Sequence, residues 1–330
     1  MLSAPINLIF AVHLKTLRRI SIILFLLCAT LSELCAQGLT NYENLISEQE
    51  QKSVLCYLSE DMTEGRDSGS IGKQYAEQFI REKFKEYGLR PFNWAYTQSF
   101  PRNDTTVIRN VVGVVPASVP SDEYIVICAH YDHLGVLGGQ VYNGADDNAS
   151  GVTALLGIAK LFSAMRTDGF NLKKNLIFAA FDGKEFSMAG SRHFLAHLPF
   201  SKSQISCVIN MDILGSTLVP LHKNTPEYII VLGNGTLPEE KRNAVNYCNY
   251  RRGMRLDLDH TFYGSRDFTR MMYEQGDHAT FADAGIPALF FTSGFHQHTY
   301  KPSDDAEIID FKVLRKRTLL IFNVIYILMQ

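Results

Sequence analysis

Short apolar runs alternate with segments of helical periodicity through the middle of the chain. The runs 124–129, 176–181 and 205–209 have the length and β-branched content of buried strands. Between them, 150–166 and 188–197 repeat apolar residues at helical spacing. Strands that alternate with helices form a largely parallel sheet covered on both faces. We therefore predict an α/β fold, a three-layer α/β/α sandwich with a mostly parallel central sheet.

The same pattern extends toward both ends of the chain. Further strands are predicted at 106–115, 228–232 and 286–292, and further helices at 37–61, 70–88, 238–251 and 310–329. The aromatic-rich segment 262–273 is predicted to be irregular. The last helix is apolar but opens with basic residues, so we expect it to pack on the domain rather than span a membrane. No repeat or linker is evident, and we predict one domain over 37–330.

The N-terminal region predicts a targeting segment. Basic residues precede the apolar run 20–31, and small residues follow near Ala36. The run is short for a membrane span, so we interpret 1–36 as a cleaved signal peptide. An uncleaved anchor is the alternative, and a lipoprotein is disfavoured because the residues before Cys35 are not small. The predicted location is therefore periplasmic or extracellular, with no stable membrane span after cleavage.

Charge and cysteine content narrow the partners and the chemistry. A formal net charge of -2 gives no reason to expect nucleic acid as a partner. Cys56, Cys128, Cys207 and Cys248 follow the predicted cleavage site and show no CxxC spacing. Two of them lie inside apolar runs, which favours buried free thiols. A Cys56–Cys248 disulfide is the alternative for an exported protein.

Possible metal ligands follow the predicted strands. His130, Glu185 and Asp212 each come just after a strand, and Asp147 begins the helix at 150–166. Singly, each has an ordinary explanation as a helix cap, a turn former or a solvated acid. Together they meet at the sheet edge where α/β proteins bind ligands, and their oxygen and nitrogen donors suit Zn²⁺. Two close ions favour hydrolysis, because they polarise a carbonyl and activate water.

Several motifs, in order, resemble one family. They read AHYDHLG, NGADDNASG, FDGKE, GSRHF, INMD and GDHATFADAGIP. This set resembles the zinc-dependent aminopeptidases of the bacterial leucyl aminopeptidase type, whose relatives include glutamate carboxypeptidases and glutaminyl cyclases. The resemblance runs from about Glu64 to about Asp305. It implies a zinc exopeptidase-like mixed sheet, two zinc ions and a peptide substrate or ligand.

The resemblance also implies roles for individual residues. His130 and Asp212 would bind one zinc ion, Glu185 the other, and Asp147 would bridge the two. The Asp147–Asn148 peptide bond would be cis. Asp132 would orient the His130 ring, and Asp277 and His278 would line the site.

Two positions depart from the family pattern. Lys184 stands where relatives carry the glutamate that takes a proton from metal-bound water. Tyr300 stands where relatives carry the last histidine ligand, and His298 or His296 would have to replace it. The second metal site is therefore predicted to be weak or empty, with the Lys184 charge in place of its ion.

These observations predict an exported zinc metallopeptidase that removes residues from peptide N-termini. One alternative is a catalytically silent relative that binds a peptide or a partner, because Lys184 cannot serve as the general base. A further alternative is a cyclotransferase like the glutaminyl cyclases, which meets the same difficulty at position 184.

Overall fold

The computed structural model describes residues 39 and 41–330. The predicted signal peptide, 1–36, lies outside the described residues. The chain divides into two compact units, Met1–Leu45 and Ile46–Gln330. In the first unit, the described residues 41–43 are helical. The second unit contains the sheet and every predicted site residue. A single domain beginning at residue 37 stays a prediction.

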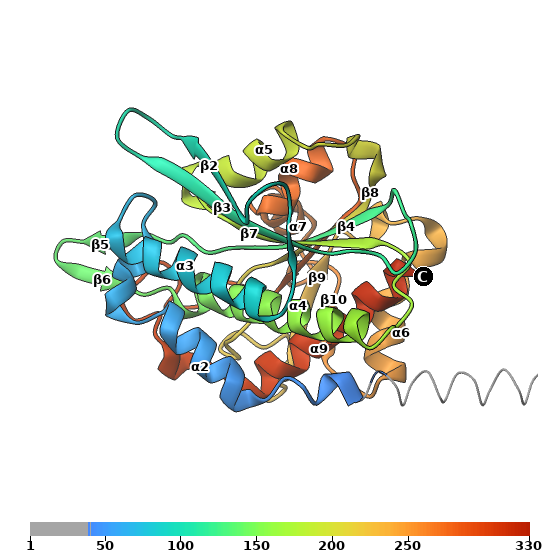
Figure 1. Cartoon of the computed structure of the whole chain (residues 1–330). Helices are drawn as coiled ribbons and strands as arrows, with labels where there is room; N and C mark the ends of the chain where they lie inside the picture. Colours follow the sequence, from blue (N-terminus) through green and yellow to red (C-terminus); the bar gives the residue numbers. More distant parts are fainter. Residues whose placement is uncertain (1–38, 40) are drawn as a thin grey trace, which may run out of the picture. The chain divides into compact units, whose positions relative to one another are not determined.

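Within the described residues, nine strands form one mixed sheet (Figure 1). Its order is β1 (Arg90–Pro91), β3 (Val107–Val115), β7 (Asn175–Phe181), β4 (Tyr124–His130), β8 (Ile205–Met211), β11 (Ala288–Thr292), β9 (Tyr228–Leu232) and β10 (Asp257–Asp259), with β2 (Thr97–Pro101) paired to β3. The central pairs from β7 to β11 are parallel, as is β9 with β10. The other pairs are antiparallel. The predicted mostly parallel mixed sheet is confirmed.

Helices cover both faces of this sheet. One layer contains α2 (Glu48–Leu58), α3 (Ile71–Glu86), α4 (Gly151–Thr167) and α9 (Phe311–Met329), which contact one another. The opposite layer contains α5 (Ala189–Ala196) and α8 (Asp277–Asp283), which appear above the sheet in Figure 1. Two shorter helices, α6 (Ala244–Arg251) and α7 (Arg266–Tyr273), complete the unit. The three-layer prediction is confirmed.

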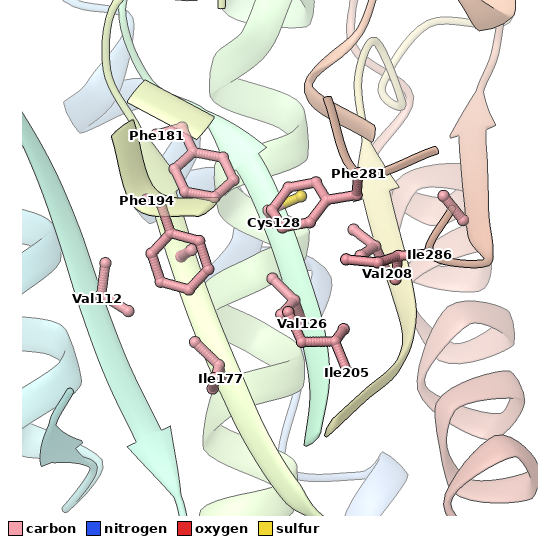
Figure 2. Packing of buried hydrophobic residues seen from close by; sticks show 12 residues of the cluster. Val112, Val126, Cys128, Ile177, Phe181, Phe194, Ile205, Val208, Phe281 and Ile286 are labelled. Atoms are coloured by element: carbon pink, nitrogen blue, oxygen red, sulfur yellow. The ribbon is translucent and has the colours of Figure 1, made fainter. Parts of the chain in front are cut away.

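The apolar runs that predicted the strands form the core between these layers. Strands β4 and β7 are buried from their second residue onward because helices cover them on both faces. Under α5 and α8, Phe194 packs against Phe181 and Phe281 with ring centroids 5.5 and 6.2 Å apart (Figure 2). This packing fixes the ends of β4, β7 and β8 relative to one another.

Several local predictions need correction. The predicted helix 238–251 is a 3₁₀ turn, Glu239–Lys241, followed by α6, and the segment predicted to be irregular contains α7, which Ser265 caps. The short hairpin of β5 (Gly135–Leu137) and β6 (Gln140–Tyr142) was not predicted. The four described cysteines are free, so the alternative Cys56–Cys248 disulfide is wrong. None of the described helices combines the length and apolar content needed to cross a membrane.

Candidate metal centre

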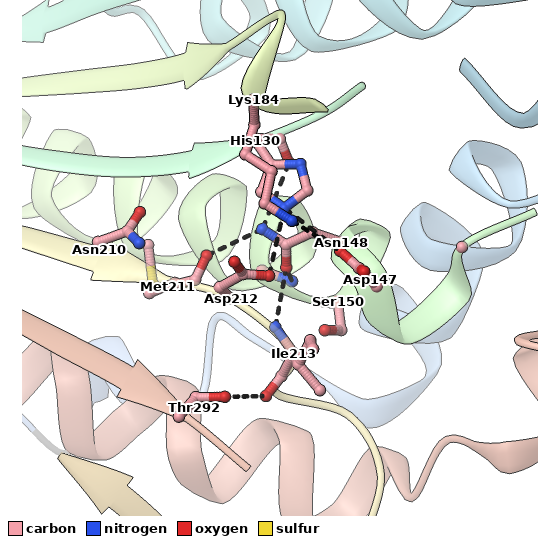
Figure 3. Close-up of polar contacts among 12 residues, drawn as sticks. His130, Asp147, Asn148, Ser150, Lys184, Asn210, Met211, Asp212, Ile213 and Thr292 are labelled. Atoms are coloured by element: carbon pink, nitrogen blue, oxygen red, sulfur yellow. Dashed lines mark hydrogen bonds and ion pairs between the residues drawn. The ribbon is translucent and has the colours of Figure 1, made fainter. Parts of the chain in front are cut away.

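Three neighbouring parallel strands deliver the polar side chains of the site to one edge of the sheet. His130 is the last residue of β4, Lys184 and Glu185 follow β7, and Asp212 follows β8. Parallel strands end at the same edge, which is why residues spread over more than eighty positions of the sequence meet there. Figure 3 shows His130, Lys184 and Asp212 gathered beside the start of α4.

Asp147 reaches this edge from the loop that precedes α4. Gly144 opens the loop with φ 54°, in the left-handed region, and a β-carbon there would collide with the Asp147 carbonyl and the His133 ring. Asp304 accepts hydrogen bonds from the amides of Asp146 and Asp147, at 2.8 and 3.0 Å. The loop is therefore held from outside as well as by its own backbone.

Asn148 ties this loop to the end of β8. The Asp147–Asn148 peptide bond is cis, as the family resemblance implies. The Asn148 side chain donates to the Met211 carbonyl at 2.9 Å and accepts from the Ile213 amide at 3.2 Å (Figure 3). The amide group of Asn148 thus sets the distance between Asp147 and the strand that carries Asp212.

His130, Asp147 and Glu185 form a group that could hold a metal ion. Each offers one ligand atom, and these atoms lie within 4.8 Å of one another. The Nε2 atom of His130 is 3.3 Å from Asp147 Oδ1 and 3.2 Å from Asp212 Oδ1. Among the described residues, neither carboxylate oxygen of buried Asp147 has a hydrogen-bond partner. A buried carboxylate that accepts no hydrogen bond is costly, and a bound cation would satisfy it.

Asp132 holds both sides of the centre from behind. Its carbonyl oxygen lies 3.0 Å from His130 Nδ1, whereas its carboxylate is 3.7 Å away. The carboxylate instead accepts the backbone amides of Lys184 and Glu185, at 3.1 and 3.2 Å. Asp132 therefore contacts the His130 ring mainly through its backbone, and its side chain fixes the turn after β7.

The Lys184 ammonium lies among the carboxylates. Its Nζ is 3.1 Å from Glu185 Oε1, 3.9 Å from Asp147 Oδ1 and 3.3 Å from the Tyr300 hydroxyl. Burial alone would lower the pKa of Lys184, but Asp147, Asp212 and Glu185 outweigh burial and raise it well above its ordinary value. Burial likewise opposes ionisation of Asp147, and Lys184 and His130 lower its pKa despite this. Lysine and aspartate therefore stabilise each other in charged form.

The two histidines considered as replacement ligands do not join this group. Nδ1 of His298 lies 2.9 Å from the Ser303 hydroxyl, and its Nε2 faces Gln297. His296 Nε2 lies 3.1 Å from Asp146 Oδ2. Tyr300 is the residue of this loop that reaches the centre, through its contact with Lys184. A second metal ion would thus find an ammonium and a phenol at this side.

Asp277 and His278 lie at the start of α8, on the other side of the sheet from α4. The Asp277 carboxylate is buried without a hydrogen-bond partner among the described residues, and burial raises its pKa to about 6. His278 is buried against Phe290, with ring centroids 4.4 Å apart, and burial lowers its pKa to about 3. Asn210 faces His278 Nδ1 at 3.3 Å. Both residues form a polar layer beneath the centre.

Comparison with known proteins agrees with this geometry. A family model described as Peptidase family M28 matches residues 110–325, which include the ligand group and Tyr300. The chain belongs to this family. The M28 assignment confirms the resemblance drawn from the motifs, and it covers the strands β4, β7, β8 and β11.

Several similar proteins show how the chain compares in extent. The aminopeptidase YwaD of Bacillus subtilis is 24% identical over 258 residues, 74% of this chain and 48% of that protein. Transferrin receptor protein 2 of Mus musculus is 24% identical over 190 residues, 57% of this chain and 23% of that protein. The structure of Porphyromonas gingivalis glutaminyl cyclase has a TM-score of 0.66 at 17% identity, over 86% of this chain and 98% of that one. The chain spans less than half the length of the first curated relatives.

Two residues beside the centre were given no role from the sequence. Arg66 is fully buried and donates to four backbone carbonyls, those of Leu58, Tyr131, Asn143 and Gly144. His133 is buried with neither ring nitrogen hydrogen-bonded among the described residues, and its ring stacks on Tyr300 at 6.3 Å. His133 lies inside the AHYDHLG motif, but the roles that the motif implies fall on His130 and Asp132. The surroundings of Arg66 offered no comparable pattern.

Proposed function

We propose that this chain is an exported, zinc-dependent hydrolase that removes residues from peptide N-termini. The single observation that carries the proposal is the buried Asp147 carboxylate, which has no hydrogen-bond partner among the described residues and lies beside His130 and Glu185. Membership of peptidase family M28 and the aminopeptidase named among the relatives support the reaction class. Export rests on the predicted signal peptide.

The residues around Asp147 suit a zinc ion. Imidazole and carboxylate groups are zinc ligands, and His130, Asp147, Glu185 and Asp212 offer them at a buried sheet edge. Zinc bound there would polarise a peptide carbonyl and make a water molecule a better nucleophile. Asp132 and Asn148 would keep the ligands in place, because each bonds the backbone of a ligand-bearing segment.

A recess beside the centre is the proposed site for the first residue of the peptide. Its walls include Lys184, Asp212, Met272, Phe290, Phe295 and Tyr300. The apolar side chains fit an uncharged side chain of the substrate. Lys184 and Asp212 are the charged residues of this wall. Asp212 would offer one oxygen to the ion, and we assign to its other oxygen the free amine of the peptide.

The proton acceptor is a separate question, because an ammonium has no lone pair. Among the carboxylates of the centre, the Glu185 side chain is 18% exposed, against 1% for Asp147 and 9% for Asp212. Water therefore reaches Glu185 most easily, and burial raises its pKa, which makes it a stronger base than an ordinary glutamate. Glu185 would offer one carboxylate oxygen to the ion, and we assign to its other oxygen the proton of the attacking water.

Lys184 also supports a second candidate function, a catalytically silent protein that binds peptide termini. An ammonium at the position of the family's general base removes the usual route for proton transfer. Transferrin receptor protein 2, by its name a receptor, is among the relatives. The cyclotransferase alternative has the glutaminyl cyclase fold in its favour, at an identity that supports the fold alone.

Hydrolysis of a panel of aminoacyl substrates separates these candidates. The wild-type protein, its Lys184→Glu variant and its Glu185→Gln variant are assayed with added zinc and again with a chelator. Our proposal expects chelator-sensitive release of the first residue by the wild type and its loss in Glu185→Gln. Activity in Lys184→Glu alone would establish the silent candidate for the natural chain. Conversion of an N-terminal glutamine to its cyclic form would establish the cyclotransferase.

A further inference from the structure

We propose that Lys184 is a resident cation that takes the place of a second metal ion, so that the centre holds one divalent ion. This inference rests on the metal site of the proposed function but not on catalysis. The position of the ammonium is the first support. It lies 3.1 Å from Glu185 Oε1 and 3.9 Å from Asp147 Oδ1, and both carboxylates belong to the metal-binding group.

The structure holds this lysine at both ends. Asp132 accepts the Lys184 backbone amide at 3.1 Å. At the other end the Tyr300 hydroxyl lies 3.3 Å from Nζ, and the Tyr300 ring centre is 5.5 Å from it. The lysine side chain is 10% exposed. A surface lysine that merely replaced another residue would extend into water, whereas this one is directed inward and bonded.

The charges of the centre balance with one divalent ion. Three carboxylates, those of Asp147, Glu185 and Asp212, surround His130 and Lys184. Against one ammonium they leave two negative charges, the charge that a single zinc ion cancels. Even when the buried Asp132 carboxylate, 3.7 Å from His130, is counted as well, a second zinc ion would leave one positive charge in excess at low dielectric, which is unfavourable.

Tyr300 is the positioning residue of this arrangement. Its phenol is neutral, so it can accept a hydrogen bond from the ammonium without adding charge. The Tyr300 ring lies parallel to that of buried His133, with an interplanar angle of 7° and centroids 6.3 Å apart, and Tyr300 is 44% exposed. We therefore expect Lys184 and Tyr300 to act together, and loss of either to change how the centre binds metal.

The test measures zinc stoichiometry and affinity rather than activity. Metal-depleted protein is titrated with zinc by calorimetry, and zinc content is measured after dialysis. The wild type is expected to bind one zinc ion per chain. Lys184→Glu combined with Tyr300→His is expected to bind two. Lys184→Met is expected to bind its single ion at least about tenfold more tightly, because a neighbouring positive charge is gone. Lys202→Glu, an exposed change of the same charge, is the matched control and should match the wild type.

Each outcome decides the inference. Two zinc ions in the wild type would overturn it, even if the protein proves to be an aminopeptidase. An unchanged zinc affinity in folded Lys184→Met would also overturn it, because a resident cation must repel the bound ion. Circular dichroism identifies a variant that fails to fold, and Lys184→Gln then replaces Lys184→Met. No zinc binding by any variant would reject the metal site itself, whereas one zinc ion without hydrolysis would support this inference and reject only the proposed catalysis.

Discussion

The buried ion pair between Lys73 and Asp182 predicts a large and specific loss of stability. Asp182 is the first residue after β7, two positions before Lys184, and its Oδ2 lies 2.5 Å from Lys73 Nζ, with both side chains fully buried. The same carboxylate accepts the Ser68 hydroxyl at 2.5 Å and the Arg109 amide at 2.7 Å. The pair therefore anchors the turn that carries the metal-binding residues.

The size of the effect follows from what each substitution leaves behind. Lys73→Met leaves the Asp182 charge buried without its partner, which costs about 3–5 kcal/mol. Adding Asp182→Asn removes that charge, and the amide oxygen still accepts one of the two remaining hydrogen bonds, which reach different oxygens of Asp182. The double variant should then lose only about 1–2 kcal/mol. A coupling of about 2 kcal/mol or more between the two positions follows.

Urea unfolding of the wild type, both single variants and the double variant at neutral pH measures this coupling. Lys83→Met is the matched control, because Lys83 forms an exposed pair with Glu86 at 2.8 Å and should cost less than about 1 kcal/mol. If Lys73→Met costs no more than this control, or if the double variant is no more stable than Lys73→Met, the buried charge is not what stabilises the turn.

Three further predictions concern other supports of the site. Asp277→Asn should stabilise the fold by about 2–3 kcal/mol at pH 8 and not at pH 4. Burial raises the pKa of Asp277 from 3.8 to about 6, so between these pH values the native state binds a proton that the unfolded state has lost, and above pH 6 the buried charge destabilises the native state. Thermal unfolding measured as a function of pH checks this, and an equal effect at pH 4 and pH 8 would contradict it. Arg66→Lys should cost about 2–4 kcal/mol in urea unfolding, because lysine cannot donate to four separate carbonyls; a loss below 1 kcal/mol would show that these bonds are dispensable. Gly144→Ala should weaken zinc binding at least about tenfold by displacing Asp147, and calorimetry showing wild-type affinity would refute that.

Much of the fold was accessible from the sequence because its signals are local. A buried parallel strand is a short apolar run, and the residue after it lies at the sheet edge. This reasoning predicted that His130, Glu185 and Asp212 lie close together. In the structure, His130 Nε2 lies 3.2 Å from Asp212 Oδ1. The helix α7 was missed although four of its eight residues are apolar or aromatic; only one of them, Met272, is buried, so its sequence resembles that of an exposed loop.

The part of the site that the sequence did not predict consists of contacts between distant segments. Lys73 and Asp182 are 109 positions apart, and Lys184 and Tyr300 are 116 positions apart. No periodicity or spacing in the sequence relates such pairs, since tertiary packing decides which of many polar residues meet. The sequence also allowed His298 to serve as the last ligand in place of Tyr300. In the structure it does not, because His298 contacts Ser303 in its own loop. Motifs identify which residues can act, but the packing decides which of them do.

The contact between Lys184 and Tyr300 changes how the two departures from the family pattern are understood. Considered separately, Lys184 replaces a general base and Tyr300 replaces a metal ligand, so each substitution is interpreted as a loss of function. In the structure the ammonium bonds to Glu185 and the phenol at once, with Asp132 holding its backbone. A residue that had only lost a function would not need partners on every side, whereas a fixed cation among three carboxylates must have them. The two substitutions are therefore better explained as one change, in which a bound metal ion is exchanged for a charge that the chain itself supplies.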